Sequence, residues 1–100
     1  MKNFEISNAN YVLGEFSEQP LKGKFKFKVF KVKSELEKKV EVINKSLEGV
    51  DDEKEREEIL QEEQEVEIDK FTEDELEQID LSIRQIAMLR PFIQFEEGEN

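Results

Sequence analysis

The sequence predicts a mostly helical α+β protein, with a helical hairpin-like core beside a small sheet of short strands. Two observations indicate this fold class. Apolar residues recur every three or four positions from Phe25 to Leu47, which is the period of a helix. Three short segments are strand candidates: 4–7 and 66–69 alternate apolar and polar residues, and in 92–95 Phe92 and Phe95 lie on either side of Ile93. The 100-residue chain is long enough for one small domain with a thin core.

The first twenty residues suggest a strand followed by a short helix. In FEIS, Phe4 and Ile6 alternate with polar residues, and Asn8 is the expected N-cap of the helix that follows. NANYVLGEFSEQ then places its apolar residues at helical spacing as far as Phe16, and Pro20 ends the helix.

The segment KGKFKFKVFKVKSELEKKVEVINKSLEG changes its apparent period partway along. Alternation covers only its first turns, whereas one helical stripe persists throughout, so we expect a helix over about 24–48 and keep a strand at 24–32 as the alternative. Gly49 is the expected C-cap. Phe27 and Phe30 lie off the stripe, which predicts that this end of the helix packs between two other elements. The stripe consists of Phe25, Val29, Val32, Leu36, Val40, Ile43 and Leu47.

The second half begins with an acidic segment, 51–64, made almost entirely of good helix formers, which predicts a mostly solvated helix. Capping boxes at Thr72/Glu75 and Ser82/Gln85 then predict either one helix or two short helices broken near residue 80, ended by Pro91. Residues 1–100 are expected to form a single domain, with 97–100 as a disordered tail.

Composition argues against most kinds of catalysis. The chain has no Cys and no His, so it lacks thiolate chemistry, the usual transition-metal ligands and a side-chain base whose pKa lies near neutral pH. The acids at 51–53 do not form a calcium-binding loop, and the serines have no His to activate them. We therefore expect no enzyme activity, no cofactor and no metal. The absence of an apolar run of about 18 residues, and of a signal-peptide core, predicts a soluble cytoplasmic protein without a membrane partner.

The charge is distributed unevenly, although the net value is −11. Residues 21–46 hold nine Lys and three Glu, a net +6, whereas residues 47–100 hold twenty acids and five bases, a net −15. Such an asymmetry can be satisfied inside the fold by ion pairs or outside it by a charged partner.

The basic segment interleaves lysines with aromatic residues, a combination that proteins use to bind single-stranded nucleic acid. The sequence pI of about 4.5 argues against it, because the overall field repels polyanions. We expect no direct nucleic-acid binding, and keep the lysines as a secondary basic stripe. The stripe consists of Lys22, Lys24, Lys26, Lys28, Lys31 and Lys33.

The acidic segment has two interpretations. Its acids could solubilise a surface helix and pair with Lys38, Lys39 and Lys45 within the fold. Alternatively, they could form an acidic face that binds the basic surface of another protein, as a mimic of DNA does. The residues of the expected partner-binding face are Asp51, Asp52, Glu53, Glu57, Glu58, Glu62 and Glu63.

Four stretches together resemble a loose group of short, uncharacterised bacteriophage proteins. They are ISNANYVLGEF, PLKGKFKFKVFKVKSELEKK, the acidic middle and FTEDELEQIDLSIRQIAMLRPFIQFEE. The resemblance implies a phage or prophage origin and carries over no functional residue. It leads us to expect a protein that binds and modulates or inhibits a host factor, such as a nucleic-acid-handling defence protein. The alternative is a phage assembly accessory that self-associates through the long amphipathic helix, which leaves a homo-oligomer open.

Overall fold

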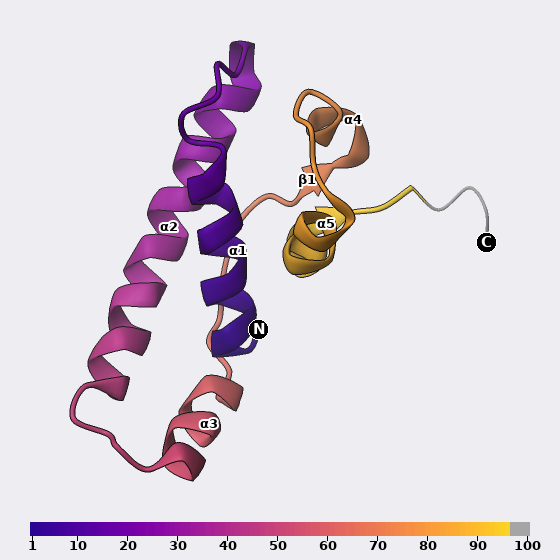
Figure 1. Ribbon diagram of the computed structural model, residues 1–100. Coiled ribbons are helices and arrows are strands. Elements are labelled where there is room, and N and C mark those ends of the chain that lie inside the picture. The colour runs from indigo at the N-terminus through magenta and orange to yellow at the C-terminus, as the bar shows by residue number, and fades with distance from the viewer. Residues whose placement is uncertain (97–100) are drawn as a thin grey trace.

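Residues 1–96 of a computed structural model are described here. They form five α-helices, a 3-10 turn and a two-stranded sheet, so the predicted mostly helical α+β class is confirmed (Figure 1). The predicted tail, 97–100, lies outside the described residues. No helix in residues 1–96 is both long and apolar enough to cross a bilayer.

Helix α1 spans Asn3–Glu15 and replaces both the predicted strand at 4–7 and the predicted cap at Asn8. The N-cap is Lys2, whose backbone N–H donates to the Glu5 carboxylate at 2.9 Å. Phe4 is exposed while Ile6 is fully buried, so the two residues do not share a face as they would on a strand. The buried face continues at helical spacing through Ala9, Val12, Leu13 and Phe16.

Helix α2 spans Gly23–Leu47, which confirms the predicted long helix and excludes the strand alternative at 24–32. Gly49 follows the C-cap Glu48 with a φ of 75°, a left-handed conformation that glycine adopts without strain. The helix lies antiparallel to α1 in a hairpin (Figure 1). Its buried stripe is Phe25, Val29, Val32, Leu36 and Ile43, with Val40 and Leu47 half-buried.

The prediction that α2 packs between two elements near its start is wrong. Phe27 is 64% exposed and Phe30 is 70% exposed, because both lie on the side of the helix opposite the buried stripe.

Beyond the third helix, α3 (Glu53–Gln61), the chain is extended but forms no strand at the predicted 66–69. Val66 and Ile68 are half-buried and their neighbours exposed, so the alternation is real. In residues 1–96, this segment has no neighbouring strand with which to form a ladder. The one bridge nearby joins Glu63 to Lys2.

The sheet instead pairs β1 (Phe71–Thr72) with β2 (Ile93–Gln94) in parallel, with Phe71 opposite Ile93. The strand predicted at 92–95 is therefore present at its centre. Phe71 is fully buried and meets the Phe25 ring edge-on, with 6.0 Å between ring centroids. This contact joins the sheet to the helical hairpin.

The last two α-helices are short and separate, as one of the two predicted alternatives requires. Helix α4 (Glu73–Leu76) and helix α5 (Ile83–Leu89) each start with the capping box expected from the sequence. A 3-10 turn, η1 (Arg90–Phe92), with Pro91 inside it, then leads into β2.

Candidate binding surfaces

Helix α3 is much shorter than the predicted acidic helix. Asp52 is its N-cap and accepts a hydrogen bond from the Glu55 N–H at 3.2 Å. Glu53 and Glu55 lie in the first turn, where carboxylates oppose the positive end of the helix dipole. Leu60 packs half-buried against the core, but none of the nine residues is fully buried, so apolar burial holds α3 less firmly than it holds the hairpin.

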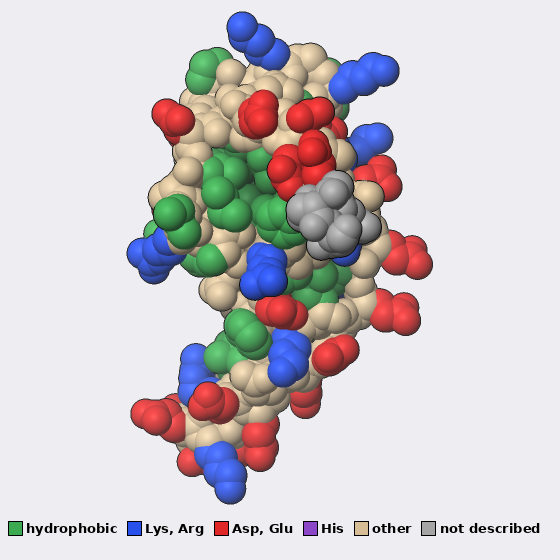
Figure 2. Space-filling model, turned by 90° about the vertical axis from the view of Figure 1, so that its right-hand side faces the viewer, with side chains coloured by type: hydrophobic (Ala, Val, Ile, Leu, Met, Phe, Trp, Pro, Cys, Tyr) green, Lys and Arg blue, Asp and Glu red, His purple; other side chains and the backbone are tan. Residues whose placement is uncertain are grey.

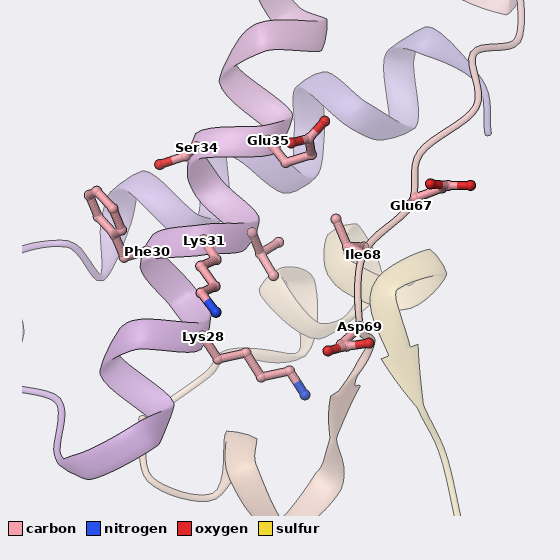
Figure 3. Close-up of a pocket in the computed structure, with 9 residues that line it drawn as sticks. Lys28, Phe30, Lys31, Ser34, Glu35, Glu67, Ile68 and Asp69 are labelled. Atoms are coloured by element: carbon pink, nitrogen blue, oxygen red, sulfur yellow. The ribbon is translucent and has the colours of Figure 1, made fainter.

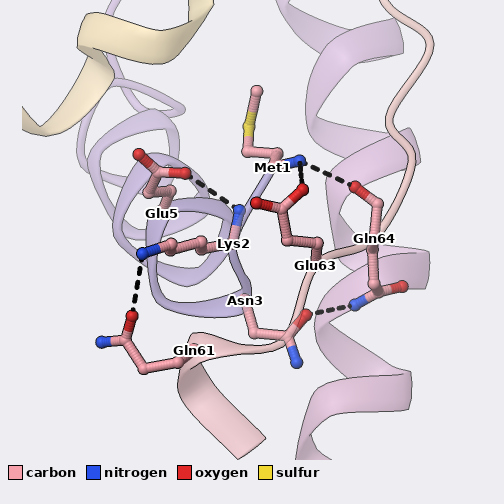
Figure 4. A network of polar contacts seen from close by, with 7 residues as sticks. All are labelled: Met1, Lys2, Asn3, Glu5, Gln61, Glu63 and Gln64. Atoms are coloured by element: carbon pink, nitrogen blue, oxygen red, sulfur yellow. Dashed lines mark hydrogen bonds and ion pairs between the residues drawn. The ribbon is translucent and has the colours of Figure 1, made fainter.

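Polar contacts with the start of the chain fix α3 in place (Figure 4). The Asn3 amide donates to the Ile59 carbonyl at 2.7 Å and accepts from Gln64 Nε2 at 2.8 Å. Asn3 is only 4% exposed, and its backbone N–H also donates to the Glu62 carbonyl at 2.9 Å. Lys2 Nζ adds a bond to Gln61 at 3.0 Å. Sequence reasoning missed Asn3, because its partners lie about sixty positions away.

The other end of α3 is tied to the end of α2. Arg56 donates to the Val50 carbonyl at 2.8 Å and to the Leu47 carbonyl at 3.3 Å. The Val50 carbonyl follows the C-terminus of α2, where the backbone has no intrahelical partner, and the Leu47 carbonyl also accepts from the Val50 N–H at 3.1 Å. The two attachments use backbone, amide and cationic groups, so they leave the carboxylates of α3 free.

All seven residues of the predicted acidic face are exposed. Five of them, together with Lys54 and Gln61, line one shallow depression, whereas Asp51 and Glu63 lie outside it. Figure 2 shows acidic side chains around the narrow lower end of the molecule, where Figure 1 places α3. We call this depression the α3 acidic surface. Its acids are Asp52, Glu53, Glu57, Glu58 and Glu62.

Internal neutralisation of these acids, which the sequence left open, is not observed. Within residues 1–96, no ion pair joins the acidic segment to Lys38, Lys39 or Lys45. Lys38 pairs with Glu35 of its own helix at 3.6 Å. Of the seven predicted acids, only Glu63 has an ion pair in the described chain, to the N-terminal amine at 3.7 Å. The acids of the α3 acidic surface therefore face solvent, and none of them forms an ion pair within residues 1–96.

The basic stripe is divided by the fold. Lys28 Nζ donates to Glu75 at 2.9 Å and to the Lys70 carbonyl at 2.7 Å, so it joins α2 to α4. Figure 3 shows Lys28 on α2, with its amine directed toward the segment that leads to β1. Lys33 pairs with Glu37 at 2.8 Å. These two lysines have structural partners. The other four, Lys22, Lys24, Lys26 and Lys31, are exposed.

The ion pair with Lys28 changes the acidity of Glu75. Partial burial acts to raise the pKa of this carboxyl, but hydrogen bonds from Lys28 and from the Thr72 N–H act in the opposite direction. The charge of Lys28 adds to them, and the net result is a pKa below the usual 4.5. Glu75 therefore stays ionised at neutral pH and contributes to the contact between α2 and α4.

In residues 1–96, no group of three or more acidic side chains is arranged to hold a metal ion. The comparisons with protein-family models, curated proteins and solved structures gave no match. The surfaces of the molecule are therefore the evidence for its function.

Proposed function

We propose that this protein acts by binding another protein, and that it does so through the α3 acidic surface. The observation that carries the proposal is the combination of a fixed backbone and free carboxylates. Asn3 and Arg56 hold α3 at its two ends, while Glu57 and Glu58 remain exposed. A charged surface that is ordered in advance loses little conformational entropy when a partner binds.

The chemistry of this surface points to a partner with a basic surface. Residues 51–63 contain eight acids and two bases. Nucleic-acid-handling proteins present such basic surfaces to phosphates, so we infer that a protein of this class is the target, in keeping with a phage-encoded modulator of a host factor. Helix α3 is nine residues long, about 14 Å at 1.5 Å per residue. The helix therefore imitates only a short stretch of a nucleic-acid backbone.

The alternative is an assembly accessory that self-associates through the apolar stripe of α2. In this fold it would have to self-associate through a different surface. The apolar stripe of α2, with Leu36 at its centre, is buried against the rest of the chain. Self-association through that stripe would require the hairpin to open. We therefore rank binding through α3 first.

Affinity capture from a bacterial lysate tests the proposal when salt and sequence are varied together. The protein is immobilised in parallel with the double variant Glu57→Gln/Glu58→Gln. A partner of this surface is retained at low salt and released at about 1 M salt, where the Debye length falls to about 3 Å. Its affinity for the double variant falls by about tenfold or more, because two partner contacts lose their charge.

The matched control is Glu18→Gln/Glu41→Gln, which changes the net charge by the same amount at exposed positions outside α3. It should retain the partner nearly as well as the original chain. Equal losses in both double variants would show that only overall charge matters, and the α3 acidic surface would then have no specific role. Retention of a partner by the Glu57/Glu58 variant would also contradict the proposal.

A further inference from the structure

The face of the molecule that carries α4 and α5 contains an apolar groove with an acidic rim. Figure 2 shows hydrophobic side chains gathered on this face with acidic side chains above them. The groove has a volume of about 410 Å³. Its apolar lining consists of Leu76, Ile79, Leu81, Ile86, Ile93 and Phe95, and its acids are Glu73, Glu77 and Asp80. We call it the α4–α5 groove.

A second hollow extends the groove along α5. It has a volume of about 400 Å³ and shares Ile86 and Phe95 with the first. Ile83, which is 86% exposed, stands at its edge. Adjoining hollows with so many apolar side chains exceed the scattered single apolar residues that are normal on a soluble surface. Arg90 is the one cation among the residues that line either hollow.

The outer face of α2 carries exposed aromatic rings and lysines, which complement an apolar groove with an acidic rim. Phe27 and Phe30 are neighbours at a three-residue spacing, and both are mostly exposed. Lys26 Nζ lies 5.4 Å from the centre of the Phe27 ring. Lys24 and Lys31 are three and four residues from Phe27, so they border the same face. We call this cluster the α2 knob.

The knob and the groove cannot meet within one chain. The knob lies on the side of α2 opposite its buried stripe, and that stripe is the side by which α2 contacts the rest of the fold. Figure 3 shows Phe30 directed away from Ile68 and the segment that leads to β1.

We propose that a second copy of this chain inserts its α2 knob into the α4–α5 groove. Phe27 and Phe30 would fill the apolar floor, while Lys24 and Lys31 would face Glu77 and Asp80. Aromatic residues surrounded by cations are typical anchors of protein interfaces, and an acidic rim selects them over an apolar occupant. This interaction uses neither Glu57 nor Glu58, so it is independent of the function proposed for α3.

The two surfaces differ, so the contact is head-to-tail. In a pair of copies, one keeps a free knob and the other keeps a free groove. Further copies can therefore add until a ring closes or a filament forms. A two-fold dimer would instead use the same patch on both copies. This difference provides a sharp test.

The test compares a knob variant, Phe27→Ser/Phe30→Ser, with a groove variant, Ile83→Ser/Ile86→Ser. Sedimentation equilibrium of the original chain from about 1 μM to about 1 mM, a range that covers weak interfaces, should show concentration-dependent association. Each variant alone should associate at least tenfold more weakly, because the anchors or their pocket are removed. An equimolar mixture should form a dimer and no larger species, since one intact knob meets one intact groove.

The matched control is Val42→Ser, an exposed apolar residue on the same helix, which should associate like the original chain. Circular dichroism checks that each variant stays helical. If the serine variants unfold, charge reversal supplies the same test: Lys31→Glu and Glu77→Lys should each weaken association, and their mixture should restore it.

Three results would overturn the proposal. They are a monomeric original chain across the whole concentration range, association that survives both double variants, and a mixture of folded variants that stays monomeric although the original chain associates.

Discussion

The α1–α2 hairpin and helix α3 are held in place by different forces. The hairpin buries a continuous apolar stripe that includes Leu13 and Leu36, and apolar burial stabilises by about 25 cal/mol per Å². Helix α3 buries no residue fully and depends on hydrogen bonds from Asn3 and Arg56, each with a net value of about 0.5–1.5 kcal/mol. The buried core, to which the hairpin contributes ten of sixteen residues, therefore supplies most of the stability, whereas α3 presents an exposed surface. Four measurements can break or sharpen this contrast.

The largest effect is expected from Leu36→Ala in the centre of the hairpin. Leu36 is fully buried, so the truncation removes apolar contacts and leaves a cavity. We expect the free energy of unfolding, measured by urea titration, to fall by about 2–5 kcal/mol. Val42→Ala on the same helix is the control, because Val42 is 54% exposed and should change the free energy little. Equal effects at the two positions would contradict the assignment of the core.

Asn3→Ala should produce a smaller and more local effect. It removes the hydrogen bonds of Asn3 to the Ile59 carbonyl and to the Gln64 amide, about 0.5–1.5 kcal/mol each and about 1–3 kcal/mol together. Hydrogen exchange should show amides of 53–61 losing protection while those of α2 keep theirs. Asn8→Ala, at an exposed position of α1, should leave α3 protected. Uniform loss across the chain would mean that α3 is part of the core.

Glu75→Gln tests the ion pair that joins α2 to α4. Because the folded-state pKa of Glu75 is lowered, its stabilising contribution is complete above the unfolded value of 4.5 and is lost as the pH falls through the folded value. The variant should be less stable at neutral pH by under about 1 kcal/mol, since the pair is partly exposed. The two proteins should converge in acid. Gln keeps the capping box with Thr72, so a constant difference at every pH would contradict the role of charge.

The smallest effect on stability is expected from Glu57→Gln/Glu58→Gln. Both carboxylates are exposed and have no ion pair in the described chain, so the urea midpoint should not change measurably. The same variant should bind the partner more weakly. This result would show that Glu57 and Glu58 serve binding and not the stability of the fold. A clear loss of stability would show that these acids help to hold α3.

Helices were predictable wherever their local signals were long or specific. Helix α2 is 25 residues long, about seven turns, and the boxes at Thr72 and Ser82 satisfy backbone groups three residues away. FEIS was too short for its period to be identified, since the buried face of α1 becomes clear only beyond Ile6. The alternation at 66–69 correctly predicted burial but not pairing, because pairing depends on a strand elsewhere.

The candidate surfaces were predictable in composition but not in arrangement. The acids of α3 were identified from charge, yet their exposure depends on where Lys38 and Lys45 point in three dimensions. Asn3 gave no signal, because an asparagine near the start of a helix is common and its partners are distant in sequence. The α2 knob was interpreted as core, since phenylalanine at helical spacing usually is.

The attachment of α3 has a kinetic consequence. Asn3 and Ile59 are 56 positions apart, so their hydrogen bond closes a long loop, whereas the hairpin forms from residues closer in sequence. The hairpin should assemble first during refolding, and α3 should join it in the last step. In the native ensemble the same region should open first, so its transient release, and not global unfolding, should set how quickly a protease cuts between residues 48 and 64.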